Sequence, residues 1–148
     1  SYSQDIERKI AKILNNACDK LNIKNGPVYA QMKLEENNPY VIEITPRLDG
    51  CHMWKVLSLY NGVNLLKLTF NHLIKNDISD LGKLKENNNK KYTLEFICQA
   101  PHTKADYTKY QRKISQAINS CSYYRTGETI RPVNGKYEKI GYFIYESN

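Results

Sequence analysis

The sequence predicts an α+β fold, in which antiparallel β-strands are flanked by helices. Three observations lead to this fold class. Residues 4–22 place apolar side chains at helical spacing, residues 28–45 alternate between apolar and polar side chains around a turn, and residues 92–145 mix strand-like and helix-like segments. Helices combined with antiparallel hairpins are typical of α+β domains.

The first expected element is an amphipathic helix over residues 4–22. Ser3 precedes it as a helix cap, and Asp5 and Glu7 place negative charge in the first turn, where the helix dipole favours it. The segment from Lys24 to Pro27 then breaks the helix. One apolar stripe runs along this helix and comprises Ile6, Ile10, Ile13, Leu14, Ala17 and Leu21.

An antiparallel hairpin is expected next, with strands over residues 28–34 and 40–45. The polar cluster Glu35–Pro39 between them is typical of a turn. With Asn37 at the turn centre, Gln31 faces Glu43 across the hairpin. The same register pairs two sets of apolar side chains, Leu34 with Tyr40 and Met32 with Ile42.

Two helices are expected after the hairpin, separated by a break at Gly62. The first covers residues 53–60, and the second begins at Asn64. We expect the second helix to bury Leu65, Leu68, Leu73 and Ile74. Residues 77–91, rich in Asn and Lys, are expected to form a loop. Within it, the Asn- and Lys-rich part over residues 83–91 is the predicted boundary between residues 1–82 and residues 83–148.

The second part is predicted to contain a strand over residues 92–100, a helix over residues 106–118, and strands over residues 122–130 and 136–145. Asn134-Gly135 is a strong turn signal, so the last two strands are expected to form a hairpin. The helix is expected to turn one set of side chains inward, namely Tyr107, Tyr110, Ile114 and Ala117.

Composition limits the function classes. The chain has 148 residues, 41% hydrophobic content and no apolar run long enough to cross a membrane, so we expect a cytoplasmic protein without a membrane partner. Its net charge of +7 comes from scattered Lys, which favours a solvated surface over a nucleic-acid partner. The cysteines and histidines lack metal-ligand spacing.

The opposed pair Gln31 and Glu43 offers hard oxygen donors on one face of the hairpin. Magnesium takes one or two such protein oxygens and completes its shell with water and phosphate. Spacing alone also fits a solvent-facing pair on an amphipathic strand. Arg47, four residues beyond Glu43, adds a guanidinium that can hold phosphate or carboxylate oxygens.

The same segment resembles the ATP-grasp family, which includes carbamoyl phosphate synthetases, biotin carboxylases and related carboxylate ligases. The family's I-E-x-N-x-R pattern is similar to Ile42–Arg47 here, and its T-G-V-D-L segment is similar to Asn61–Leu65. The resemblance covers about residues 20 to 70. Thr45 stands where the family usually has Asn, and Gln31 stands where many members have Glu and carbamoyl phosphate synthetases have Gln.

The resemblance implies that Gln31, Glu43 and Thr45 hold Mg²⁺ and that Gln31, Lys33 and Glu43 contact ATP. Arg47 becomes the catalytic residue, which stabilises the transferred phosphoryl group. The implied activity is that of a carbamoyl phosphate synthetase-like ligase, which activates a carboxylate or bicarbonate as an acyl phosphate for transfer to an amine. Residues 1–82 then form the second half of an ATP-grasp domain, and residues 83–148 a small C-terminal α+β domain.

Other parts of the family's nucleotide clamp have no counterpart in this sequence. No glycine-rich phosphate loop is present, so we expect a fragment whose N-terminal part is missing and which is inactive alone. Two alternatives stay open. One is a basic α+β module that binds nucleic acid. The other is a non-catalytic ATP-grasp scaffold, which is supported by Thr45 standing where the family usually has Asn. The sequence also leaves a homo-oligomer open.

Overall fold

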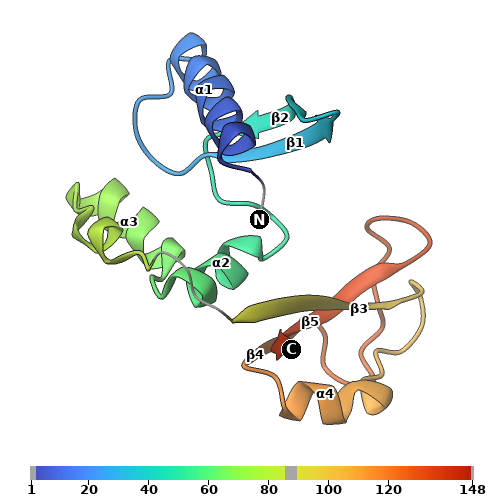
Figure 1. Ribbon diagram of the computed structural model, residues 1–148. Helices are drawn as coiled ribbons and strands as arrows, with labels where there is room; N and C mark the ends of the chain where they lie inside the picture. The colour runs from blue at the N-terminus through green and yellow to red at the C-terminus, as the bar shows by residue number, and fades with distance from the viewer. Residues whose placement is uncertain (1–2, 86–89, 148) are drawn as a thin grey trace. The chain divides into compact units, whose positions relative to one another are not determined.

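The computed structural model describes residues 3–85 and 90–147, and it confirms the α+β fold class. The chain forms two compact units (Figure 1). Unit 1 comprises residues 1–55 and 63–83, and unit 2 comprises residues 56–62 and 84–148. Each unit contains its own antiparallel sheet. Four residues of the expected Asn- and Lys-rich loop, 86–89, lie outside the described residues.

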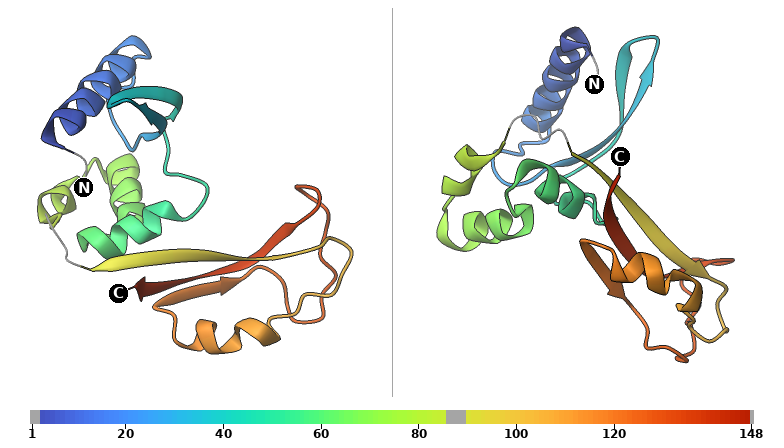
Figure 2. Two further views of the ribbon diagram at one scale, coloured as in Figure 1. Left: turned by 45° about the vertical axis from the view of Figure 1, so that its right-hand side comes forward. Right: turned by 60° about the horizontal axis from the view of Figure 1, so that its bottom comes forward.

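Unit 1 begins with α1, Gln4–Lys20, which contacts one strand of the hairpin. The Ser3 hydroxyl accepts a hydrogen bond from the Ile6 amide at 3.4 Å, so the expected cap is confirmed. Ile6 is the buried residue of this helix. Figure 2 shows α1 beside the hairpin in both views, consistent with the amphipathic pattern.

The hairpin consists of β1, Tyr29–Glu35, and β2, Asn38–Thr45. Its turn is tighter than expected, because Glu35 pairs with Asn38 and only two residues connect the strands. Glu36 and Asn37 both adopt positive φ, at 47° and 66°. Positive φ at both central residues is what a type I′ turn requires. The predicted five-residue turn is therefore wrong.

A β-bulge shifts the pairing of the two strands by one residue next to the candidate site. Met32 pairs with Val41, whereas Gln31 pairs with Glu43, so Ile42 is the extra residue on β2. The expected pairs of Leu34 with Tyr40 and of Met32 with Ile42 are wrong. A shift of one residue exchanges the faces of a strand, and Tyr40 and Ile42 are accordingly exposed.

Three helical segments follow the hairpin: α2, Met53–Asn61, α3, Leu65–Lys75, and a short 3₁₀ helix, η1, Ser79–Lys83. Asn64 caps α3 by accepting a hydrogen bond from the Lys67 amide at 3.0 Å. The expected burial of Leu73 and Ile74 is wrong, because their side chains are 66% and 75% exposed. The apolar face of α3 is therefore only partly covered.

Unit 2 is built on the sheet order β3-β5-β4, with all neighbours antiparallel. The expected strand over residues 122–130 is wrong, because β4 ends where it was expected to begin, so no tight hairpin joins β4 to β5. The expected helix over residues 106–118 is shorter and divided. The elements of unit 2 after α2 are β3, Lys91–Gln99, η2, Thr108–Tyr110, α4, Gln111–Ser115, β4, Asn119–Ser122, and β5, Glu138–Ser147.

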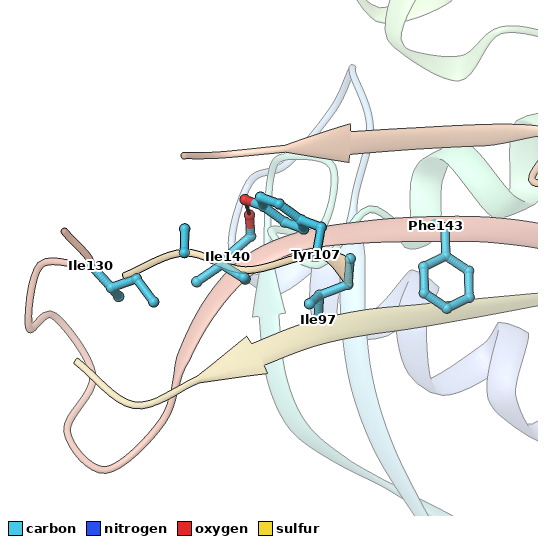
Figure 3. Close-up of a cluster of buried hydrophobic side chains, with 6 residues drawn as sticks. Ile97, Tyr107, Ile130, Ile140 and Phe143 are labelled. Carbon is cyan, nitrogen blue, oxygen red and sulfur yellow. Dashed lines mark hydrogen bonds between the residues drawn. The ribbon is translucent and has the colours of Figure 1, made fainter. Parts of the chain in front are cut away.

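Figure 3 shows the buried side chains of the core of unit 2, and side chains from the segment that carries α4 pack against this core. It centres on Phe143 and Ile97, which are fully buried, and on Tyr107, whose hydroxyl donates a hydrogen bond to the Ile140 carbonyl at 2.8 Å. The predicted inward side chains of this segment are confirmed, since Tyr107 is in the core and three others pack against it: Tyr110, Ile114 and Ala117.

A buried carboxylate holds the loop before β5. Glu138 is 2% exposed, and its oxygens accept hydrogen bonds from the amides of Val133, Asn134 and Gly135 at 2.6–3.2 Å. These backbone donors hold the pKa of the Glu138 carboxyl below its usual range, against the opposing effect of desolvation. Asn134 and Gly135 thus lie in a loop organised by Glu138.

Candidate functional site

The site predicted from the sequence lies on the hairpin of unit 1. Gln31 and Glu43 are directly opposed, as predicted, and both are exposed. Opposed residues of an antiparallel pair project from the same face, with Cβ atoms about 4.5–5.5 Å apart. An amide oxygen and a carboxylate therefore stand side by side, next to the bulge at Ile42.

Lys33 is on the same face, two residues along β1 from Gln31. Its ammonium lies 3.5 Å from a Glu35 carboxylate oxygen, and both side chains are 61% exposed. An ion pair between exposed groups contributes little, so it holds Lys33 weakly. The ammonium is thus accessible to an anionic ligand near the opposed pair.

Thr45 follows Glu43 by two residues on β2, so the two residues share a face. The Thr45 hydroxyl oxygen is buried, and within the described residues it has no hydrogen-bond partner. A buried hydroxyl without a partner is unfavourable. The oxygen predicted as a magnesium ligand is therefore not exposed alongside the Gln31–Glu43 pair.

Arg47 lies just beyond the end of β2. Its amide donates a hydrogen bond to the Thr45 carbonyl at 2.9 Å, which turns the chain sharply at Pro46. Its guanidinium is exposed and donates from Nη1 to the Leu48 carbonyl at 2.9 Å. The structure thus places Arg47 two residues beyond Thr45, at the same end of the hairpin.

Sequence reasoning missed the role of Asp49. Its carboxylate accepts hydrogen bonds from the amides of Cys51, Met53 and Trp54 at 2.7, 2.9 and 2.6 Å. Two of these donors, Met53 and Trp54, are the first residues of α2, so Asp49 caps that helix from four residues before Met53. The signal was present, since an Asp shortly before a helical segment is a common cap.

The donor chemistry of these residues fits magnesium that is already bound to a nucleotide. Carboxylate, amide and hydroxyl oxygens are the hard ligands that Mg²⁺ prefers, and Mg²⁺ needs only one or two of them when phosphate completes its shell. Among residues 3–85 and 90–147, no group of three or more His, Cys, Asp or Glu side chains forms a metal site. Glu43 is thus the charged oxygen donor of the candidate set.

The chain is similar in structure to an L-amino acid ligase from Bacillus licheniformis. The similarity has a TM-score of 0.74 and 18% sequence identity, and it covers 99% of this chain but only 38% of that chain. No protein family matches the sequence, and no curated protein matches it. At this level of identity the likeness shows a shared fold and nothing further. No helix among the described residues is long and apolar enough to span a membrane.

Proposed function

We propose that this chain is part of an ATP-dependent ligase of the ATP-grasp class. The proposed reaction activates a carboxylate or bicarbonate as an acyl phosphate and transfers the acyl group to an amine. One observation carries the proposal, namely that Gln31 and Glu43 oppose each other on an exposed face with Thr45 and Arg47 at the same end of the hairpin. This is the arrangement that the ATP-grasp resemblance implies.

Each residue has a proposed role. Glu43, Gln31 and Thr45 hold Mg²⁺ on ATP, and Gln31, Lys33 and Glu43 contact the nucleotide. Bound Mg²⁺ would neutralise phosphate charge. Arg47 stabilises the transferred phosphoryl group, because a guanidinium can contact two phosphate oxygens at once.

The rest of the ligase lies outside this chain in the proposal. The structural neighbour is more than twice as long as the segment that this chain matches. We therefore propose that an N-terminal part supplies the opposite wall of the nucleotide clamp. The assignment of residues 1–82 to the ATP-grasp domain and of residues 83–148 to a C-terminal domain stays a prediction, as does a homo-oligomer.

The substrate class is proposed at two levels. The neighbour's name, an L-amino acid ligase, supports a ligase that joins a carboxylate to an amine. Carbamoyl phosphate synthetase-like specificity rests on Gln31 alone and stays a prediction. A non-catalytic scaffold is the competing proposal, and Thr45 supports it, because its hydroxyl oxygen is buried in the position where the family has Asn.

Three substitutions in the complete enzyme test the catalytic proposal. Glu43→Gln removes the charged ligand, so we expect turnover to fall on the order of 10³-fold. Gln31→Glu introduces the residue that many ATP-grasp members carry, so activity should stay within about tenfold. Arg47→Lys keeps the positive charge but loses the planar guanidinium that can contact two phosphate oxygens at once, so kcat should fall more than nucleotide affinity. The measurement is steady-state ATP hydrolysis with acceptor.

Two further results bear on the assignment. Full activity of Glu43→Gln together with an inactive Gln31→Glu would contradict it, provided both variants keep the circular dichroism spectrum of the parent. The isolated chain should bind Mg-ATP no more tightly than about millimolar in isothermal titration, because one wall of the clamp is missing. Micromolar binding would place the nucleotide site within this chain alone.

A further inference from the structure

We propose that Asp49 is a positioning residue for Arg47, an inference that rests on the proposed function. Asp49 does not belong to the set of residues that face the nucleotide in that proposal. It lies in the loop between the end of β2 and the start of α2, and it acts on catalysis by fixing the loop on which the Arg47 guanidinium rests.

The Asp49 carboxylate ties this loop to the helix. One oxygen, Oδ2, accepts from the amides of Cys51 and Met53, and the other, Oδ1, accepts from the amide of Trp54. Both oxygens are therefore engaged. The Met53 and Trp54 amides are otherwise unsatisfied donors at the helix start, and the Cys51 amide belongs to the loop before it. A carboxylate satisfies them better than a hydroxyl or an amide, because an ionised acceptor forms stronger hydrogen bonds.

The Arg47 side chain folds onto the same loop. Its Nη1 donates to the Leu48 carbonyl at 2.9 Å, and a Cβ added to Gly50 would lie 3.8 Å from that nitrogen. The guanidinium thus rests on the residues that flank Asp49 on either side. A guanidinium that is held through one nitrogen still has other N–H groups that can donate to a phosphoryl oxygen.

Asp49 also decides where an anion can bind. The start of a helix attracts anions through its free amides and its dipole. At α2 these amides already bind the Asp49 carboxylate, whose negative charge repels phosphate. Arg47 is therefore the cationic group that this loop offers to a transferred phosphoryl group.

The kinetic test uses the complete enzyme and a double-mutant cycle. Asp49→Asn leaves one carbonyl oxygen and places an NH₂ group against backbone donors, so the loop loosens. We expect kcat to fall about tenfold, with the KM for ATP changed less than about twofold. If Asp49 acts through Arg47, the double variant Asp49→Asn/Arg47→Lys should be no slower than Arg47→Lys alone, within about twofold.

A matched control separates this role from helix capping in general. Asn64 caps α3 through one hydrogen bond to the Lys67 amide at 3.0 Å and lies outside the site. Asn64→Ala should lower thermal stability without changing kcat. Multiplicative losses in the double variant, or an equal loss of kcat in Asn64→Ala, would overturn the proposal.

A spectroscopic readout tests the geometry without any activity. In the isolated chain labelled with ¹⁵N, the Arg47 guanidinium should show slowed hydrogen exchange because Nη1 is bonded to Leu48, and Asp49→Asn should remove this protection while Asn64→Ala keeps it. An unprotected Arg47 in the native chain overturns the inference whatever the enzyme does. Failure of the proposed function is recognised separately, by an active Glu43→Gln variant.

Discussion

The two units differ most in how they bury apolar side chains. Leaving proline and glycine aside, eight of the ten buried apolar residues found among residues 3–85 and 90–147 belong to unit 2, and unit 1 contributes Ile6 and Val63. Unit 1 instead exposes much of α3, including Phe70, Leu73 and Ile74. Unit 2 is therefore stabilised by a core, whereas unit 1 depends on caps, a tight turn and one helix against a two-stranded sheet.

This difference has a consequence for the candidate site. A two-stranded sheet is marginal by itself and needs packing against other elements. Within the described part of the chain, α1 is the only element of unit 1 in extensive contact with the hairpin that carries Gln31 and Glu43. The proposed catalytic residues thus lie on the unit with the smaller core, which agrees with the proposal that further polypeptide completes this part of the enzyme.

The largest expected effect is the loss of the unit 2 core. Phe143→Ala removes a fully buried ring, so the free energy of unfolding of unit 2 should fall by about 3–5 kcal/mol. Amide hydrogen exchange of β5 reports on unit 2 during urea denaturation, and fluorescence of Trp54, the single tryptophan, reports on unit 1. The Trp54 transition should stay close to that of the parent chain.

A control substitution in unit 1 gives the reverse comparison. Ile6→Ala removes a buried side chain of α1, so it should shift the Trp54 transition and spare the exchange of β5. Coincident shifts of both probes in both variants would show that the two units unfold together and have no separate stabilities.

The hairpin shows how far sequence reasoning reached in unit 1. Alternation predicted both strands and the pairing of Gln31 with Glu43, and the structure confirms them. The predicted register was nevertheless wrong nearer the turn. The turn at Glu36-Asn37 is tighter than predicted and shifts the pairing by one residue, and the bulge at Ile42 reverses this shift before Gln31 and Glu43. Asn37 favours positive φ but Glu36 does not, so local chemistry gave only half of the signal for this turn.

Long-range packing explains the other errors. The apolar spacing of α3 predicted a buried face, but spacing carries no information about what covers that face, and Leu73 and Ile74 are exposed. In unit 2, the Asn134-Gly135 pair predicted a hairpin turn. It instead belongs to a loop held by Glu138, a contact that periodicity does not encode.

An intermediate effect is expected at Glu138, and it depends on pH. The folded-state pKa of this carboxyl is lowered, so its stabilisation of unit 2 is complete above the unfolded-state value, about 4.3, and is lost as pH falls through the folded-state value. Glu138→Gln should lower the free energy of unfolding at pH 7. It should also make this free energy depend less on pH in the acid range, the acid limb of the stability profile. Urea denaturation followed at several pH values measures both effects.

An exposed glutamate on the same strand serves as the control. Glu146 forms an exposed ion pair with Lys90 at 2.9 Å, so Glu146→Gln should change stability by less than about 1 kcal/mol. An unchanged acid limb in Glu138→Gln would show that the loop of residues 133–135 does not depend on this carboxylate.

The smallest effect is expected at the turn of the hairpin, where unit 1 depends on local backbone geometry. Glu36 adopts a φ of 47°, a conformation that disfavours most side chains and that Asn tolerates. Glu36→Asn should therefore raise the stability of unit 1 by about 0.5–1 kcal/mol, measured through Trp54 fluorescence in urea, and leave the exchange of β5 unchanged. Glu36→Gln is the matched control, because it removes the same charge but keeps a side chain without this preference. Equal stabilisation by both variants would assign the effect to charge and would show that the turn geometry does not limit the stability of unit 1.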